Sequence, residues 1–210
     1  MDLETLIADV RSLIDEEDVT AGFWTDVSLT RWINQGNIDL ARRLENLEDT
    51  ESSNVVALTP NYNLPTDCIK IRRVTYNSRA LYPIEYETLN DITADGSGEL
   101  TETGTPTNFY IFDNDIWLYP VPSASLALGL KIWYYKRPAT LTNTVDTPEQ
   151  PEQYHYLISL FAFNRALLKD TLDTTAMRIM DMYLKGVEEA KGELRRDQKV
   201  QMKQISFIDE

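Results

Sequence analysis

Few side chains in this sequence could serve as a catalytic nucleophile or base. The chain holds one histidine, His155, and one cysteine, Cys68, so a serine or cysteine triad would depend on that single imidazole ring. His155 lies at the predicted start of a helix, where a histidine is far more often a surface or packing residue than a base. Zinc sites built from several Cys or His ligands are excluded by the number of such residues. We therefore predict that the protein is not an enzyme and that it holds no cofactor and no metal.

Carboxylates are the most numerous groups that could do chemistry, and many of them lie in one stretch. The formal net charge is −14, and the sequence from Ala80 to Leu130 contains no Lys or Arg. Eight acids lie in that stretch: Glu85, Glu87, Asp91, Asp95, Glu99, Glu102, Asp113 and Asp115. Their spacing does not match a calcium-binding loop. Because phosphate groups bind clustered cations, the stretch is predicted to bind nucleic acid poorly. Two interpretations remain open, a charge that keeps the protein soluble and a surface that does not hold DNA.

Aromatic side chains could form a binding platform in the same region. The members are Phe109, Tyr110, Phe112, Trp117, Tyr119, Trp133, Tyr134 and Tyr135. Such rings can stack on sugars or bases, and acids in a neighbouring loop could then cleave glycosidic bonds. Half of an alternating aromatic strand usually faces a core, however, so packing is the favoured interpretation. A carbohydrate-binding or glycoside-hydrolysing module is kept as an alternative function.

The aromatic residues lie in a stretch with strand-like patterns. Two aromatic runs flank Asp113-Asn114-Asp115, residue types that tolerate turn conformations, which predicts a β-hairpin. A third run at 126–135 alternates with period two and is predicted to complete a three-stranded meander. Residues 68–74 are predicted to form an edge or half-exposed strand. Shorter strands are predicted at 54–58 and 81–86, and an exposed loop at 87–104.

Helical spacing of apolar residues is found on both sides of this block. Four amphipathic helices are predicted, at 2–15, from Thr25 to about Leu47, at 151–169, and from about 173 to 197. Thr25 is a good N-cap residue, and Gly36 is predicted to permit a close helix contact. Asp146-Thr147-Pro148 is a capping signal ahead of the third helix.

This order of elements predicts an α+β fold. Residues 1–52 and 139–197 are predicted to form a four-helix bundle, anchored by Trp24 and Trp32, with an antiparallel β domain at 53–138 inserted between helices two and three. No stretch approaches the roughly 18 apolar residues of a membrane span. No signal peptide is predicted, and a single cysteine fits a protein folded in a reducing cytoplasm.

Residues 198–210 are predicted to form an extended C-terminal tail. The tail carries five apolar residues that have no partner within the predicted monomer: Val200, Met202, Ile205, Phe207 and Ile208. A mobile terminus rarely carries so many unless they dock somewhere. The segment is compatible with an added strand or an induced helix on a partner, and folding back onto its own bundle stays open.

Five segments together resemble a known family. They are Trp24-Thr-Asp-Val-Ser-Leu-Thr-Arg-Trp-Ile-Asn34-Gln-Gly, Tyr62-Asn-Leu-Pro-Thr-Asp67, Gly104-Thr-Pro-Thr-Asn-Phe-Tyr110, Ile116-Trp-Leu-Tyr-Pro120 and Trp133-Tyr-Tyr-Lys-Arg-Pro138. In this order they are similar to the head-to-tail adaptor (connector) proteins of tailed bacteriophages, especially the short-tailed type. The resemblance covers roughly residues 1–197 and rests on the combination of motifs.

The resemblance implies a structural protein of the virion. It implies a ring, commonly of about twelve copies, that is seated beneath the portal, continues the DNA channel and docks the downstream tail or nozzle protein. The C-terminal tail would contact the portal, and the acid-only stretch would line a channel through which DNA passes without specific binding. The protein would be made in the host bacterial cytoplasm and would not involve a membrane. Another tail-side structural protein of the same particle is the remaining alternative.

Overall fold

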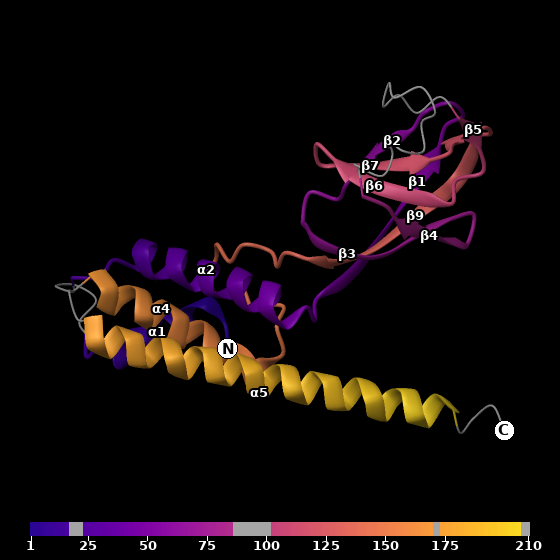
Figure 1. Cartoon of the computed structure of the whole chain (residues 1–210). Coiled ribbons are helices and arrows are strands. Elements are labelled where there is room, and N and C mark those ends of the chain that lie inside the picture. Colours follow the sequence, from indigo (N-terminus) through magenta and orange to yellow (C-terminus); the bar gives the residue numbers. More distant parts are fainter. Residues whose placement is uncertain (17–22, 86–101, 170–172, 207–210) are drawn as a thin grey trace. The chain divides into compact units, whose positions relative to one another are not determined.

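The computed structural model describes residues 1–16, 23–85, 102–169 and 173–206, with side chains from 174 to 196 in the last range (Figure 1). The chain divides into two compact units, and each is described by itself. The helical unit comprises Met1–Leu47 and Arg137–Glu210, and the β unit comprises Glu48–Lys136. Helices and a large, mostly antiparallel sheet make this an α+β protein, as predicted.

The described part of the helical unit contains four α-helices. They are α1 (Leu3–Leu13), α2 (Asp26–Leu44), α4 (His155–Lys169) and α5 (Asp173–Ser206), with a short 3-10 helix, η1 (Glu152–Tyr154), ahead of α4. Thr25 caps α2 as predicted, since its side chain accepts a hydrogen bond from the Ser28 N–H at 3.3 Å. Asp2 caps α1 in the same way through the Thr5 N–H at 2.9 Å.

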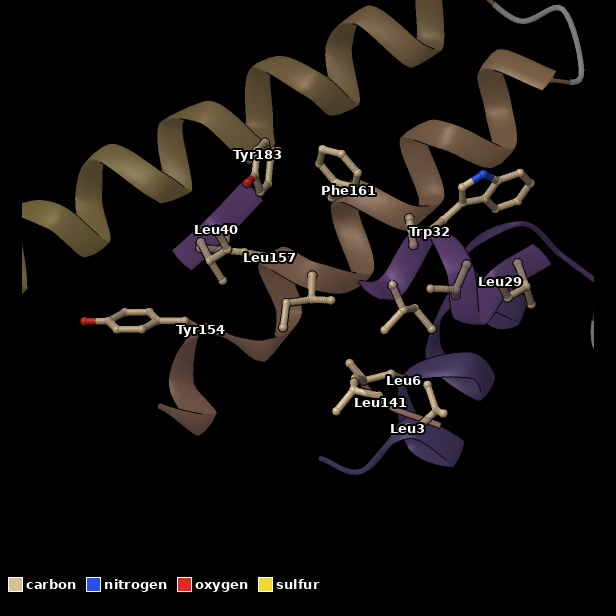
Figure 2. Close-up of a cluster of buried hydrophobic side chains, with 14 of the residues drawn as sticks. Leu3, Leu6, Leu29, Trp32, Leu40, Leu141, Tyr154, Leu157, Phe161 and Tyr183 are labelled. Atoms are coloured by element: carbon tan, nitrogen blue, oxygen red, sulfur yellow. The ribbon is translucent and has the colours of Figure 1, made fainter. Parts of the chain in front are cut away.

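Helix α4 contacts the three other helices, and the apolar core of the unit lies around it (Figure 2). The fully buried members include Leu6, Leu29, Ile33, Leu40, Leu157, Ile158 and Tyr183. The close approach predicted at Gly36 is present, because a Cβ atom there would lie 3.1 Å from the Cβ of Phe161. Apolar stripes at helical spacing therefore face one another across α4, which explains why these segments fold as helices.

The capping prediction for Asp146 is wrong. Its carboxylate accepts the backbone N–H groups of Thr142 and Asn143, both at 2.7 Å, and so closes a turn ahead of the helix. These bonds hold the pKa of Asp146 below its ordinary value. The helical segment itself begins after Pro151, with η1 leading into α4.

The last helix is longer than predicted. Helix α5 runs without a break to Ser206, so the prediction of an extended segment from residue 198 is wrong for residues 198–206. Residues 207–210 lie outside the described residues. The sequence between Gly192 and Ser206 holds no Gly or Pro stop signal and is rich in Lys, Arg, Gln and Met, which favour helix.

Arg11 is a buried cation that joins the first two helices. Its Nη2 donates to the carbonyl oxygen of Trp24 at 2.9 Å and to the Asp26 carboxylate at 2.7 Å, and Nη1 lies 3.6 Å from Glu16. We expect Arg11→Ala to lower the free energy of unfolding by about 2 kcal/mol, because hydrogen bonds to charged groups and buried side-chain volume are lost together. Arg11→Lys keeps the charge but not the fork geometry and should recover less than half of that loss. Urea unfolding followed by circular dichroism measures both, and a wild-type midpoint for Arg11→Ala would contradict the role assigned to Arg11.

His155 is a buried packing residue whose ring also makes the helical unit sensitive to acid. Burial lowers the pKa of the imidazole, opposed by the hydrogen bond between Nε2 and the Gln150 carbonyl at 2.8 Å. Near pH 6.5 the unfolded chain therefore binds more protons at this residue than the folded chain does. Stability should fall as the pH drops below about 6.5, by up to about 1.4 kcal/mol per pH unit. Urea unfolding at a series of pH values tests this, with His155→Gln expected to show a flatter profile over that range.

In the described residues of the β unit, seven strands form a sheet with the order β1-β9-β3-β4-β6-β7-β2. The strands are β1 (Glu48–Val55), β2 (Asn61–Asn63), β3 (Cys68–Tyr76), β4 (Arg79–Pro83), β6 (Asn108–Phe112), β7 (Asp115–Tyr119) and β9 (Leu126–Lys136). Neighbouring strands are antiparallel except β4 and β6, which are parallel. A separate parallel pair joins β5 (Thr103–Gly104) to β8 (Val121–Pro122).

The hairpin predicted around residues 113–115 is confirmed, but the meander is wrong. Asp113 and Asn114 have φ angles of 51° and 64°, as a two-residue turn between β6 and β7 requires. The third strand, β9, does not pair with β7; it lies between β1 and β3. Strand β3 is therefore internal in the sheet, so the edge alternative of its prediction is wrong. The half-exposed alternative fits, because Lys70, Arg72 and Arg73 are exposed whereas Val74 to Tyr76 are buried.

Two further details of the strand predictions differ. Strand β1 begins at Glu48 and ends at Val55, earlier than the predicted strand at 54–58. In β9, Leu130, Ile132 and Tyr134 are buried as the alternation predicts, but Leu128 is 67% exposed. Leu128 has a φ of 50°, and its N–H donates to the Asn54 side chain at 2.8 Å. This irregularity turns the side chain out of the alternating pattern.

Candidate assembly surfaces

The C-terminal part of α5 extends beyond the apolar core of the helical unit. Among the side chains of this helix that the structure describes (174–196), Ala176, Tyr183, Val187 and Ala190 are buried, and Leu194 packs partly against the same core. The Tyr154 hydroxyl donates to Glu193 at 3.2 Å at the same level. The helix continues from Leu194 to Ser206, which is about 18 Å of further helix. Figure 1 shows this part continuing past α2 and α4.

The predicted portal-binding residues fall on this part of the chain. Val200, Met202 and Ile205 lie in helical backbone, whereas Phe207 and Ile208 lie outside the described residues. The structure thus places three of the five in one continuous element with the bundle. The sequence analysis predicts an extended tail for these residues.

Four of the eight predicted surface acids are described. Glu85 and Asp113 are exposed, and Asp113 forms the β6–β7 turn. Asp115 accepts a hydrogen bond from the Asn61 side-chain amide at 2.8 Å. Glu102 accepts one from the Tyr119 hydroxyl at 2.6 Å. The remaining acids, Glu87, Asp91, Asp95 and Glu99, lie outside the described residues.

The bond between Glu102 and Tyr119 ties an acid to the sheet. The carboxylate, together with burial of the ring, raises the pKa of Tyr119 to about 12. The phenol therefore stays protonated at neutral pH and acts as a fixed donor to a charged acceptor. The hydrogen bonds from Tyr119 and Asn61 thus hold the side chains of Glu102 and Asp115 in position.

The cations of the β unit are confined to three strands, a grouping that is not visible in the sequence. All Lys and Arg residues between 48 and 136 lie on β3, β4 and β9: Lys70, Arg72, Arg73, Arg79, Lys131 and Lys136. Lys131 and Arg73 both lie over the ring of Trp133, at 4.8 and 5.5 Å from its centroid. Arg72 forms an ion pair with Glu48. Strand β3 lies between β9 and β4 in the sheet, although β9 is far from both in the sequence. The grouping of these cations therefore becomes visible only from the strand order.

Both tryptophans predicted as bundle anchors are buried, at 6% exposure each. Their rings meet edge to face at 5.4 Å between centroids, and the ammonium group of Lys169 lies 4.6 Å from the Trp24 centroid. These contacts connect the start of α2 to the end of α4. The aromatic residues of the β unit are divided: Phe109, Tyr110, Tyr119 and Tyr134 are buried, whereas Phe112 is 52% exposed.

Within the described residues, neither His155 nor Cys68 has the surroundings expected of a catalytic base or nucleophile. His155 is 1% exposed, and burial raises the pKa of the Cys68 thiol, which lowers its thiolate fraction. No group of three or more His, Cys, Asp or Glu side chains gathers among the described residues as a metal site would need. In the same ranges, no helix is long and apolar enough to cross a membrane.

Comparison with protein families bears on the choice between a phage adaptor and a carbohydrate-binding module. A family model described as SU10 adaptor protein matches residues 1–204. The chain belongs to the SU10 adaptor family. A search of curated proteins found no match. Family membership confirms the predicted resemblance to phage adaptors and identifies the chain as a structural adaptor protein of a tailed bacteriophage. It favours the structural hypothesis over the carbohydrate-binding alternative.

The segments that carry the adaptor resemblance have structural roles in this chain. The Asn34 side chain donates to the Leu141 carbonyl at 3.0 Å and accepts from the Leu141 N–H at 2.8 Å. It thereby joins α2 to the segment ahead of α4. Asp67 accepts a hydrogen bond from the Tyr134 hydroxyl at 3.1 Å and connects two of the segments. The resemblance therefore rests largely on residues that hold each unit together.

Proposed function

We propose that this adaptor assembles into a ring beneath the portal of the phage, continues the DNA channel and docks the downstream tail or nozzle protein. The ring would hold about twelve copies, in line with the closed rotational symmetry of such assemblies. The bundle at 1–52 and 139–197 would form the body of the ring, and the β domain at 53–138 would carry contacts to neighbours and to the tail. The protein would act in the virion at the junction of head and tail.

The observation that supports portal binding is the length of α5 beyond the core. About 18 Å of helix after Leu194 carries apolar residues at 200, 202 and 205, with two more following at 207 and 208. Apolar residues on a helix that extends past its own core are suited to a groove on another protein. We assign this end of the chain, including Val200 and Ile205, to the portal contact.

The charge distribution supports passage of DNA without retention. The stretch from Ala80 to Leu130 carries acids and no Lys or Arg, and Glu102 and Asp115 are held in fixed positions. Repeated around a ring, this stretch would line the channel with negative charge, which repels phosphate groups. Specific binding of DNA is not expected.

Native mass spectrometry of the purified chain mixed with its cognate portal ring tests the proposal. The expected result is a complex with one fixed number of adaptor copies per portal ring. A monomeric free protein is compatible with this, because adaptor segments can become ordered on assembly. Absence of any complex at micromolar concentrations would overturn the adaptor ring. A complex with only a few adaptor copies and no closed ring would instead favour another tail-side structural protein.

A further inference from the structure

One face of the sheet in the β unit carries an aromatic residue with two cations beside it. The aromatic residue is Trp133 of β9, which is half-buried. The side chains of Lys131 and Arg73 both lie over its ring, at 4.8 and 5.5 Å from the centroid. Tyr135, two residues further along β9, is also half-buried, and the alternation of a strand places it on the same face. We call these four residues the cationic face.

Strand β1 carries acids on the opposite face of the same sheet. In its pairing with β9, Asp49 lies opposite Tyr134. Glu51 lies opposite Ile132 in the same pairing. Both of these β9 residues are buried in the core, and residues paired across two strands share a face. Because β1 is the outermost strand of the sheet, the two acids nevertheless remain exposed. We call Asp49 and Glu51 the acidic edge.

The cationic face and the acidic edge cannot neutralise each other within one copy. Lys131 lies opposite Ser52 of β1, and Ser52 and Glu51 point to opposite faces because they are adjacent in a strand. Among the described residues, neither Arg73 nor Lys131 forms an ion pair with an acid, and the acidic edge forms none with a cation. Both surfaces are therefore left with charge that a second molecule could pair.

The composition of the cationic face is that of a protein interface. One acid of β1, Glu48, lies on this face opposite Tyr135, but it already forms an ion pair with Arg72. Trp, Tyr and Arg are the residue types most enriched among those that contribute most to binding between proteins. A face with these residue types and two cations fits a partner that presents carboxylates.

We propose that the cationic face of each copy binds the acidic edge of the next copy in the ring. The contact rests on the proposed ring and specifies which parts of the β unit meet there. Its two sides are different surfaces of one chain, so each copy binds one neighbour through its face and the other through its edge, which allows a closed ring. Two cationic faces would repel each other, as would two acidic edges. The charges therefore favour a head-to-tail order over a two-fold dimer.

Charge reversal in two separate variants tests the contact. Lys131→Glu changes a cation of the face into an acid, and Glu51→Lys changes an acid of the edge into a cation. In a ring of either variant alone, every contact would bring like charges together, so the concentration needed for assembly on the portal ring should rise at least about tenfold. An equimolar mixture can alternate the two variants, and every contact then pairs opposite charges. Native mass spectrometry should show that the mixture assembles at a concentration close to that of the wild-type chain.

Arg79→Glu is the matched control. Arg79 is an exposed cation of β4 that lies opposite Tyr76. Tyr76 in turn lies opposite Leu130, which is buried on the other face of the sheet from Lys131. Arg79→Glu should therefore assemble like the wild-type chain, and its mixture with Glu51→Lys should stay impaired. Thermal unfolding checks that all three variants fold.

Three results overturn the inference and leave the proposed function intact. Wild-type assembly by both single variants would show that the two surfaces do not meet. Impaired assembly of folded variants that the mixture does not recover would show that the face binds another partner, such as an acidic segment of the tail protein. Normal assembly of Lys131→Glu with loss of binding to a double-stranded DNA probe would assign the face to phosphate groups. Failure of the wild-type chain to assemble on the portal counts against the proposed function itself.

Discussion

Replacing Tyr183 with alanine is expected to lower the free energy of unfolding of the helical unit by about 3–5 kcal/mol, the usual cost of removing a buried aromatic ring. Tyr183 is fully buried between α5 and the rest of the core. Its ring meets Phe161 edge to face at 5.5 Å between centroids, as Figure 2 shows. Loss of the ring leaves a cavity at the contact between α4 and α5, and the closely packed helices can collapse into it only in part.

The hydroxyl of Tyr183 contributes separately. It donates to Asp39 at 2.7 Å, and the same carboxylate accepts from Arg43 at 2.6 Å. Tyr183→Phe keeps the ring and the Asp39–Arg43 pair, so it should cost about 1 kcal/mol. Urea unfolding of both variants separates the two contributions. A cost below about 1 kcal/mol for Tyr183→Ala would show that the α4–α5 contact is not a main source of stability.

Helix positions followed from the sequence because helical contacts are mostly local. Apolar spacing placed all four helices, and the Thr25 cap defined the start of α2 within one residue. The position at which α5 ends could not be predicted from the sequence. Alternation around Val200 and Met202 is compatible with either a strand or a helix over so few residues, whereas the absence of a stop signal after Gly192 favoured continuation.

The strand order did not follow from the sequence because it depends on pairing between distant segments. Strand β1 reads Glu-Asp-Thr-Glu-Ser-Ser-Asn-Val, which has no apolar alternation, since an edge strand with both faces largely exposed needs none. Without β1, nothing in the sequence indicated that β9 is separated from β7. The sequence identified the hairpin at Asp113 because that signal lies within a few residues.

The charged surfaces also differ in whether the sequence reveals them. The acid-only stretch is visible in the sequence as a continuous run. The two cations over the Trp133 ring, Arg73 and Lys131, are not visible in this way, because they lie on β3 and β9, which are separated by dozens of residues in the sequence.

Ending the chain at Asp197 is expected to weaken portal binding by at least about 100-fold, or roughly 2.7 kcal/mol. The truncation removes the end of α5 and all five apolar residues assigned to the portal contact, from Val200 to Ile208. The last described contacts of α5 with its own core are at Leu194 and Glu193, so the helical unit should unfold at the wild-type temperature. Titration of the portal ring with full-length and truncated chain, followed by analytical ultracentrifugation, measures the difference.

A point substitution distinguishes a specific contact from a simple loss of length. Ile205→Asp places a charge among the apolar residues of the helix end and should weaken portal binding at least about tenfold, since a desolvated charge without a partner is costly at an interface. Met177→Asp is the matched control, because Met177 lies on the same helix, is 67% exposed and belongs to the end of α5 that packs on the bundle. Equal affinities for the two variants, together with full binding by the truncated chain, would move the portal contact from the helix end to the bundle.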